Sequence, residues 1–270
     1  MPLTDFQREL LAVTARNRAP DSYLAGGTAL HFSPESVRYS RDLDLFHDAE
    51  ERVAEAFAAD VASLEESGYE VEMILSQPGF IRALVSRGEE ATQIDWADSA
   101  WRFMPVMADE LGGYVLHPID LATNKVLALA GRDEPRDFVD MLFALDTILP
   151  LGPLVWAAVA KDPGYNPMSL LEQLRRRGRV RPEEVARLDL SRPFDVEEAK
   201  TRWREALEDA ERFVERRPPG EVGALYWSAK MGRFVAPEPD VPLDAQGLAI
   251  HYGRMGGVLP RPTAQRLDID

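Results

Sequence analysis

The sequence predicts an α/β (α+β) fold, in which a small twisted mixed sheet flanked by helices is followed by a mainly helical C-terminal region. Three observations support this prediction. Apolar and polar residues alternate with a period of two over 69–75 and 92–97, and 80–86 is apolar and branched, as in three consecutive strands. Apolar residues with helical spacing precede and follow these strands. The 270 residues, 45% of them hydrophobic, are enough to bury a sizeable core.

The N-terminal half divides into elements by its apolar spacing and its turn residues. Acids and apolar residues alternate over 42–46, which is typical of a half-buried strand. The segment that follows has apolar residues every three or four positions and ends before Gly68, a suitable C-cap residue. The expected elements are a helix over 3–13, a strand over 23–25, a glycine turn at 26–28 leading into a short helix, a strand over 42–46, a helix over 50–67 and the three-strand meander.

Two further helices close the first half of the chain. One begins at Pro118 and ends at Gly131, and the next begins at Pro135. The run Leu149-Pro150-Leu151-Gly152-Pro153 is the best candidate for a domain junction, because two prolines and a glycine cannot continue a helix. We therefore expect a core over 1–148 and a mainly helical region over 149–270 with a loop-rich tail. Helices are expected there over 168–177, 182–188 and 196–216.

Composition excludes several classes of protein. The chain has no cysteine, which excludes disulfides, thiolate zinc sites and cysteine nucleophiles. Its 31 Lys and Arg against 46 Asp and Glu give a net charge of −15, which repels nucleic acid unless a local basic patch overrides it. The N-terminus lacks the apolar stretch of a signal peptide, and no run approaches the roughly 18 apolar residues of a membrane span. We expect a cytoplasmic protein without a membrane partner.

Three aspartates are the candidate metal ligands. Asp42 and Asp44 lie two residues apart on a predicted strand, so their side chains share one face and can hold a magnesium ion. Asp95 lies on the polar face of the predicted 92–97 strand and completes the site if that strand is a neighbour. It is either a third metal ligand or the base for an acceptor hydroxyl, and a two-metal site is one possibility. A lone Asp-x-Asp pair, or a lone aspartate on a strand, is more often part of a solvated strand face.

Residues before the aspartates suit a phosphate-binding loop. Gly26 and Gly27 allow backbone N–H groups to approach phosphate oxygens, and the hydroxyl of Thr28 or Ser40 can add a hydrogen bond. Arg38 adds a positive charge. A lone Gly-Gly pair is usually only a turn. Its combination with the Arg-x-Ser-x-Asp-x-Asp segment favours a nucleotide site.

Together, Gly26-Gly27-Thr28 and Arg38-Tyr39-Ser40-Arg41-Asp42-Leu43-Asp44 resemble the nucleotidyltransferases of the AbiEii/AbiGii toxin type, of the DNA polymerase beta-like superfamily. The resemblance covers about 23–145 and includes Lys125 and Arg136-Asp137-Phe138-Val139-Asp140, which is similar to the family's Arg-Asp-x-x-Asp segment. It implies that Asp42 and Asp44 bind metal, that Lys125 contacts the nucleoside triphosphate and that Asp137 or Asp140 is needed for activity. The sequence leaves open which of these two matters. Arg132, about two helical turns after Lys125, can assist it.

The resemblance also implies a reaction and its partners. We expect magnesium-dependent transfer of a nucleoside monophosphate from a triphosphate to a macromolecule. RNA, in particular transfer RNA, is the leading acceptor, and a protein acceptor is left open. The protein would be the toxin of a toxin-antitoxin pair, with an antitoxin protein as partner. One alternative is a small-molecule nucleotidyltransferase of the aminoglycoside-modifying kind, because the acidic net charge suits cationic substrates. Another is a regulatory module whose nucleotide site no longer turns over.

A basic segment in the C-terminal half is the candidate contact for RNA. Such a cluster can hold an RNA backbone, although it can equally be a solvated helix end. It contains only two acids, Glu183 and Glu184, among six arginines: Arg175, Arg176, Arg177, Arg179, Arg181 and Arg187.

Overall fold

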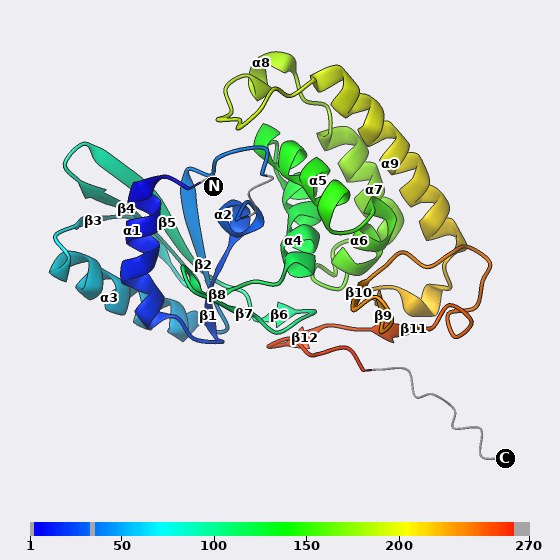
Figure 1. Ribbon diagram of the computed structural model, residues 1–270, viewed down its shortest axis with the longest axis horizontal. Coiled ribbons are helices and arrows are strands. Elements are labelled where there is room, and N and C mark those ends of the chain that lie inside the picture. Colours follow the sequence, from blue (N-terminus) through cyan, green and yellow to red (C-terminus); the bar gives the residue numbers. More distant parts are fainter. Residues whose placement is uncertain (1–2, 33–35, 262–270) are drawn as a thin grey trace. The chain divides into compact units, whose positions relative to one another are not determined.

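The computed structural model describes residues 3–32 and 36–261. The chain forms two compact units (Figure 1). The first comprises 1–121 with the later segments 182–194 and 254–257, and the second comprises 122–181, 195–253 and 258–270. Whether 1–148 folds as a domain of its own stays a prediction, because the compact units divide the chain at other positions.

The first unit is built on a mixed sheet. Its seven strands in the described residues follow the order β3-β4-β5-β2-β1-β8-β7. Two neighbouring pairs are parallel, β2 with β5 and β1 with β8, and the others are antiparallel. The elements of this unit are α1 (Asp5–Thr14), β1 (Ser22–Ala25), α2 (Gly26–Leu30), β2 (Asp42–His47), α3 (Glu50–Glu66), β3 (Glu70–Gln77), β4 (Phe80–Arg87), β5 (Glu90–Asp98), β6 (Trp101–Arg102), β7 (Met107–Asp109), β8 (Gly113–Val115), α8 (Pro182–Val185) and β12 (Arg254–Met255).

The predicted elements of this half are confirmed, and the alternation explains how they pack. On β2 the residues Leu43 and Leu45 are 1% exposed, and on β5 the residues Ile94 and Trp96 are fully buried. Helices α1 and α3 pack on this apolar face, where the ring of Phe57 meets that of Trp96 edge to face at 5.0 Å. The intervening side chains of β2 and β5 therefore lie on the opposite face. Strands β7 and β8 were not expected from the sequence, because they are short and weakly patterned.

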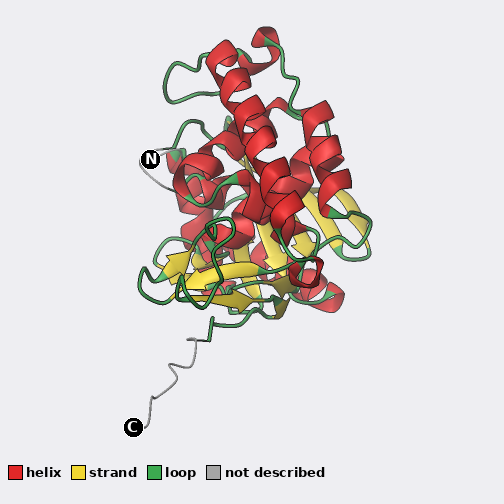
Figure 2. Cartoon of the chain, turned by 90° about the vertical axis from the view of Figure 1, so that its right-hand side faces the viewer, coloured by secondary structure: helices red, strands yellow, loops and turns green. Residues whose placement is uncertain are grey.

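Helices dominate the second unit, together with one small sheet (Figure 2). The helical predictions for this half are confirmed. The structure adds an antiparallel sheet in the order β10-β9-β11, where the sequence suggested only loops. The elements are α4 (Pro118–Gly131), which begins in the first unit, α5 (Pro135–Thr147), α6 (Leu151–Ala158), α7 (Pro167–Arg177), α9 (Val196–Arg216), β9 (Leu225–Ser228), β10 (Arg233–Phe234) and β11 (Leu248–His251).

The run Leu149–Pro153 begins a helix and does not form a linker. Gly152 and Pro153 lie in the first turn of α6, where a proline is tolerated because the first N–H groups of a helix have no intrahelical acceptor. Gly152 packs against Phe213 of α9, and a Cβ there would come within 2.7 Å of the Phe213 Cβ. The sequence analysis missed this helix and its burial, whereas the domain junction itself stays a prediction.

No single helix in the described ranges is long and apolar enough to cross a bilayer. Helices α5 and α6 reach that length only when they are taken together, and they are bent by 114° at their break.

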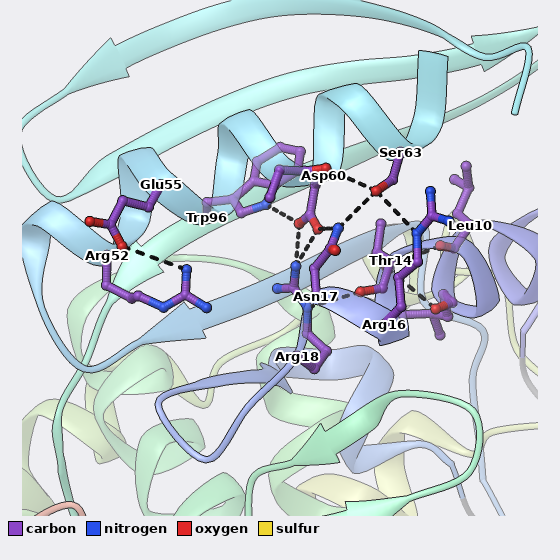
Figure 3. Close-up of polar contacts among 12 residues, drawn as sticks. Leu10, Thr14, Arg16, Asn17, Arg18, Arg52, Glu55, Asp60, Ser63 and Trp96 are labelled. Atoms are coloured by element: carbon purple, nitrogen blue, oxygen red, sulfur yellow. Dashed lines mark hydrogen bonds and ion pairs between the residues drawn. The ribbon is translucent and has the colours of Figure 1, made fainter. Parts of the chain in front are cut away.

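A buried ion pair fixes α3 against the sheet (Figure 3). Asp60 of α3 is fully buried and pairs with the guanidinium of Arg18, whose side chain is 1% exposed. The same carboxylate accepts hydrogen bonds from the Asn17 amide at 2.9 Å and from the Trp96 indole at 2.8 Å. Asp60 thus connects three parts of the unit, namely the segment after α1, helix α3 and strand β5.

Replacing Asp60 with Asn should destabilise the protein strongly. The Asn side chain keeps the size of the acid, so the main loss is the countercharge of a buried guanidinium, at a cost of about 3–5 kcal/mol. Urea unfolding measures this loss. Glu66→Gln is the control: it breaks the exposed Arg16–Glu66 pair of the same region and should cost less than about 1 kcal/mol. Equal losses for the two variants would contradict the anchoring role of Asp60.

Candidate active site

The three candidate metal ligands lie on two neighbouring strands. In the parallel pairing of β2 with β5, Asp44 is opposite Asp95 and Asp42 is opposite Gln93. Asp42 and Asp44 are half-buried, and Asp95 is 7% exposed. The structure therefore places the three carboxylates on one face of the sheet, away from the face that α1 and α3 cover.

An arginine that the sequence analysis did not single out holds Asp95. Arg82 of β4 donates from Nε to one Asp95 oxygen at 2.8 Å and from Nη2 to the other at 2.6 Å. The Gln93 amide adds a hydrogen bond at 3.2 Å. Both oxygens of Asp95 are thus occupied by protein donors. The sequence contained a signal for this contact, because Arg82 is a charged residue within a predicted strand. The antiparallel register that pairs Arg82 with Asp95, however, is set only in the tertiary structure.

The residues present fit a divalent cation held by two carboxylates. Among the described residues, no group of three His, Cys, Asp or Glu side chains is arranged to hold a metal ion. Magnesium in nucleotide sites needs only one or two protein carboxylates, since phosphates and waters complete its octahedral shell. Asp42 and Asp44 can supply these. The positive charge of Arg82 beside Asp95 opposes metal binding at that third carboxylate.

The two glycines make room for charged side chains. Gly26 has φ +64°, and a Cβ there would come within 1.7 Å of an Asp44 oxygen. A Cβ on Gly27 would come within 2.6 Å of Nη2 of Arg38. The glycines form the first turn of α2, so they are part of the short helix that was expected to follow them. Any larger residue would displace the carboxylate or the guanidinium.

The hydroxyl groups of Thr28 and Ser40 hold the start of β2. Thr28 Oγ1 donates to the Asp42 carbonyl at 2.6 Å, and Ser40 Oγ donates to an Asp42 carboxylate oxygen at 3.0 Å. Both residues are at most 2% exposed. Their hydrogen bonds fix the position of Asp42.

A segment from the C-terminal half holds Arg38. The backbone N–H of Tyr39 donates to the Asp189 carbonyl at 2.8 Å, and that of Ser191 donates to the Val37 carbonyl at 3.0 Å. Arg38 is 4% exposed and lies between these bonds, with its Nη1 donating to the Tyr39 carbonyl at 3.0 Å. No local sequence signal connects residues this far apart in the chain.

Lys125, Arg132, Asp137 and Asp140 form one ion-pair cluster in the second unit. Nζ of Lys125 lies 3.1 Å from an Asp137 oxygen and 2.8 Å from an Asp140 oxygen. Arg132 donates from Nε to Asp137 at 2.6 Å. The carboxylate side chains are fully buried, whereas those of Lys125 and Arg132 are 8% and 48% exposed. A ligand approaching this cluster would meet the cations.

The electrostatics of the cluster depend on its cations. Burial alone would raise the pKa of Asp137, but the charge of Lys125 and the charge and hydrogen bonds of Arg132 outweigh burial and lower that pKa below its usual value. The carboxylate therefore stays ionised at neutral pH.

Some arginines of the basic segment line a pocket, and some form surface ion pairs. Arg175, Arg176 and Arg177 pair with Glu211, Glu172 and Asp133, respectively. Arg187 belongs to the first unit. A cavity of about 800 Å³ beside α7 and α9 is lined by two acids, Glu197 and Glu208, and by five cations: Arg175, Arg179, Arg181, Lys200 and Arg204.

Three solved structures of other proteins are similar to this chain. Two solved structures from Helicobacter pylori resemble the chain: one provisionally described as a nucleotidyltransferase (17% identity, 79% of this chain and 98% of that one, TM-score 0.48) and JHP933 (16%, 77% and 90%, TM-score 0.47). The Megavirus polyadenylate synthase is a third (13%, 60% and 38%, TM-score 0.38). No curated protein matches the sequence.

The family model described as "Nucleotidyl transferase AbiEii toxin, Type IV TA system" matches residues 9–240. This span includes every residue of the two clusters described above. It also extends well beyond the part of the chain on which the sequence resemblance rests. The chain belongs to the AbiEii nucleotidyltransferase toxin family.

Proposed function

We propose that this nucleotidyltransferase uses a magnesium ion on Asp42 and Asp44 to move a nucleoside monophosphate from a nucleoside triphosphate to RNA, with transfer RNA as the leading acceptor. The observation that carries the proposal is the pair of half-buried carboxylates on β2, beside glycines that leave no room for any other side chain. Membership of a Type IV toxin-antitoxin family implies an antitoxin partner and a triphosphate substrate. A cytoplasmic location is part of this proposal.

The proposed reaction is an in-line displacement at the α-phosphate. An acceptor hydroxyl oxygen forms a bond to the α-phosphorus, the bond from that phosphorus to the bridging oxygen breaks, and pyrophosphate leaves with the electron pair. The hydroxyl proton passes to a base, either Asp95 or water. When bound, magnesium neutralises phosphate charge and orients the reacting groups. The chain's own residues mainly hold and orient the substrate, as is usual in phosphoryl transfer.

In this proposal Lys125 and Arg132 offset the charge of the triphosphate. Asp137 and Asp140 are positioning residues, because both are fully buried and act through the cations that they hold. The proposal therefore gives a role to both aspartates. Lys125 contacts both carboxylates, so loss of either should disturb it, whereas only Asp137 also holds Arg132.

The cavity beside α7 and α9 supports RNA as the acceptor. Lys200 is paired with Glu197 at 2.8 Å and Arg175 with Glu211 at 3.0 Å. Within the described residues, Arg179 and Arg204 make no ion pair with a carboxylate, although Arg204 donates to the Thr201 hydroxyl. An unneutralised positive pocket in a chain with a net charge of −15 is suited to phosphodiester groups.

The other candidate acceptors predict different products. The acidic net charge favours a cationic small molecule as the alternative acceptor, and a module without turnover would label nothing. Incubation with each labelled triphosphate, magnesium, total RNA and an aminoglycoside distinguishes the three cases by the compound that becomes labelled.

Asp42→Asn and Asp44→Asn should each reduce nucleotide transfer by at least about 100-fold, because each removes one carboxylate that would neutralise phosphate charge through the metal. The labelling assay measures the loss, and circular dichroism checks the fold. Asp98→Asn is the matched control, since Asp98 is an exposed acid at the end of β5 and should keep wild-type activity. Full activity of the Asp42 variant would show that β2 does not hold the metal.

Lys125→Met should lower the stability to urea by about 3–5 kcal/mol, since it removes the cation that contacts both buried carboxylates. Lys125→Met with Asp140→Asn should recover part of this loss, because the double variant no longer has the buried charge of Asp140. The double variant, measured where it is folded, should still bind triphosphate at least about tenfold more weakly. Lys200→Met, which breaks an exposed pair, is the control and should change neither property. Normal triphosphate affinity of the folded double variant would reduce Lys125 to a structural role.

Arg179→Gln with Arg204→Gln should lower the salt dependence of RNA binding. Each lost phosphate contact on single-stranded RNA reduces the log-log slope by about 0.7. Fluorescence anisotropy with a labelled RNA oligonucleotide at several salt concentrations measures this slope. Arg176→Gln with Arg212→Gln removes the same charge from two arginines that already pair with Glu172 and Asp209, and it should leave the slope unchanged. Equal slopes for both double variants would place the RNA elsewhere.

A further inference from the structure

Arg82 lies in one row with the carboxylates of Asp95 and Asp44 on the polar face of the sheet. Arg82 on β4 is opposite Asp95 on β5, and Asp95 is opposite Asp44 on β2. Side chains at directly opposite positions of neighbouring strands lie on the same face, with Cβ atoms about 4.5–5.5 Å apart. The pairing of three adjacent strands therefore fixes the order arginine, aspartate, aspartate.

The contact between Arg82 and Asp95 is more specific and less exposed than an ordinary surface ion pair. The guanidinium donates to both carboxylate oxygens in the parallel, two-bond geometry that makes arginine pairs specific. The Asp95 side chain is 10% exposed and that of Arg82 is 37% exposed. The pair is therefore partly shielded from water, and the arginine lies on its solvent side.

Without Arg82, the row would consist of neighbouring carboxylates. Like charges held close together disfavour each other's ionisation and destabilise the fold that holds them. In the described structure Arg82 supplies the compensating charge at Asp95. Its positive charge also opposes the approach of a metal ion to Asp95.

We infer that Arg82 is the resident counter-ion of this row and makes metal binding depend on the nucleotide. With Asp95 held by Arg82, the protein offers a divalent cation only Asp42 and Asp44. An ion that arrives with a triphosphate brings its own phosphate ligands, whereas the ion alone meets an incomplete site that contains a positive charge. The inference rests on the proposed function, which places the metal on these two residues.

Arg82→Met tests this inference in the full-length protein without nucleotide. In EDTA the variant should melt about 2–4 °C below wild type, because Asp95 loses its countercharge. Magnesium chloride alone should then raise its melting temperature by more than it raises that of wild type. Calorimetric titration with magnesium alone should show an affinity about tenfold higher than that of wild type, because a third carboxylate becomes available.

Two further variants separate this role from a general effect of charge. Arg87→Met removes the same charge from the same strand, where Arg87 pairs with Glu9, and it should keep the wild-type response to magnesium. Arg82→Lys keeps the charge and should respond to magnesium as wild type does. A magnesium response of Arg82→Met equal to that of Arg87→Met, or loss of folding both with and without magnesium, would overturn the inference. If wild type gains no stability even from magnesium with triphosphate, the metal site of the proposed function itself is wrong.

Discussion

The parallel pairing of β2 with β5 is the constraint on which the candidate site depends. Parallel neighbours cannot be joined by a tight turn, so the chain must cross over, and here it does so through α3 and the β3–β4 hairpin. The register of this pairing puts Asp44 opposite Asp95. The crossover helix is held by Asp60, whose buried carboxylate binds Arg18 and the Trp96 indole of β5. A structural ion pair on one face of the sheet thus supports a functional arrangement on the other.

A common electrostatic rule connects the charged clusters of both units. Four buried or nearly buried carboxylates have a cation in direct contact: Arg18 at Asp60, Arg82 at Asp95, and Lys125 at Asp137 and Asp140. An isolated buried charge is far more costly than a paired one. In the first pair both partners are buried, so its role is structural. In the other two clusters the cations are the more exposed partners, so their positive charge lies nearer the surface.

The family assignment and the residue geometry answer different questions. Membership of the AbiEii family establishes nucleotidyl transfer, but a fold or family does not by itself identify an acceptor. The acceptor that we propose rests on a local feature, the basic cavity beside α7 and α9 in an otherwise acidic chain. The most informative residues for substrate choice therefore lie outside the Gly-Gly-Thr and Asp-x-Asp motifs by which the family is recognised.

The sequence by itself determined the helices and strands of the N-terminal half and the shared face of Asp42 and Asp44, because periodicity is a local property of the chain. It did not determine the helix that starts at Leu151, since the same prolines and glycine suit a linker or a first helical turn. It also missed the short strands β7 to β11, which tertiary pairing stabilises more than their own patterns do. Only the tertiary structure decided that Asp95 faces Arg82, that residues 189–191 hold Arg38 and that Lys125 lies between two buried aspartates. These contacts join residues whose spacing carries no periodic signal, so they exist only once strand register and helix packing are set.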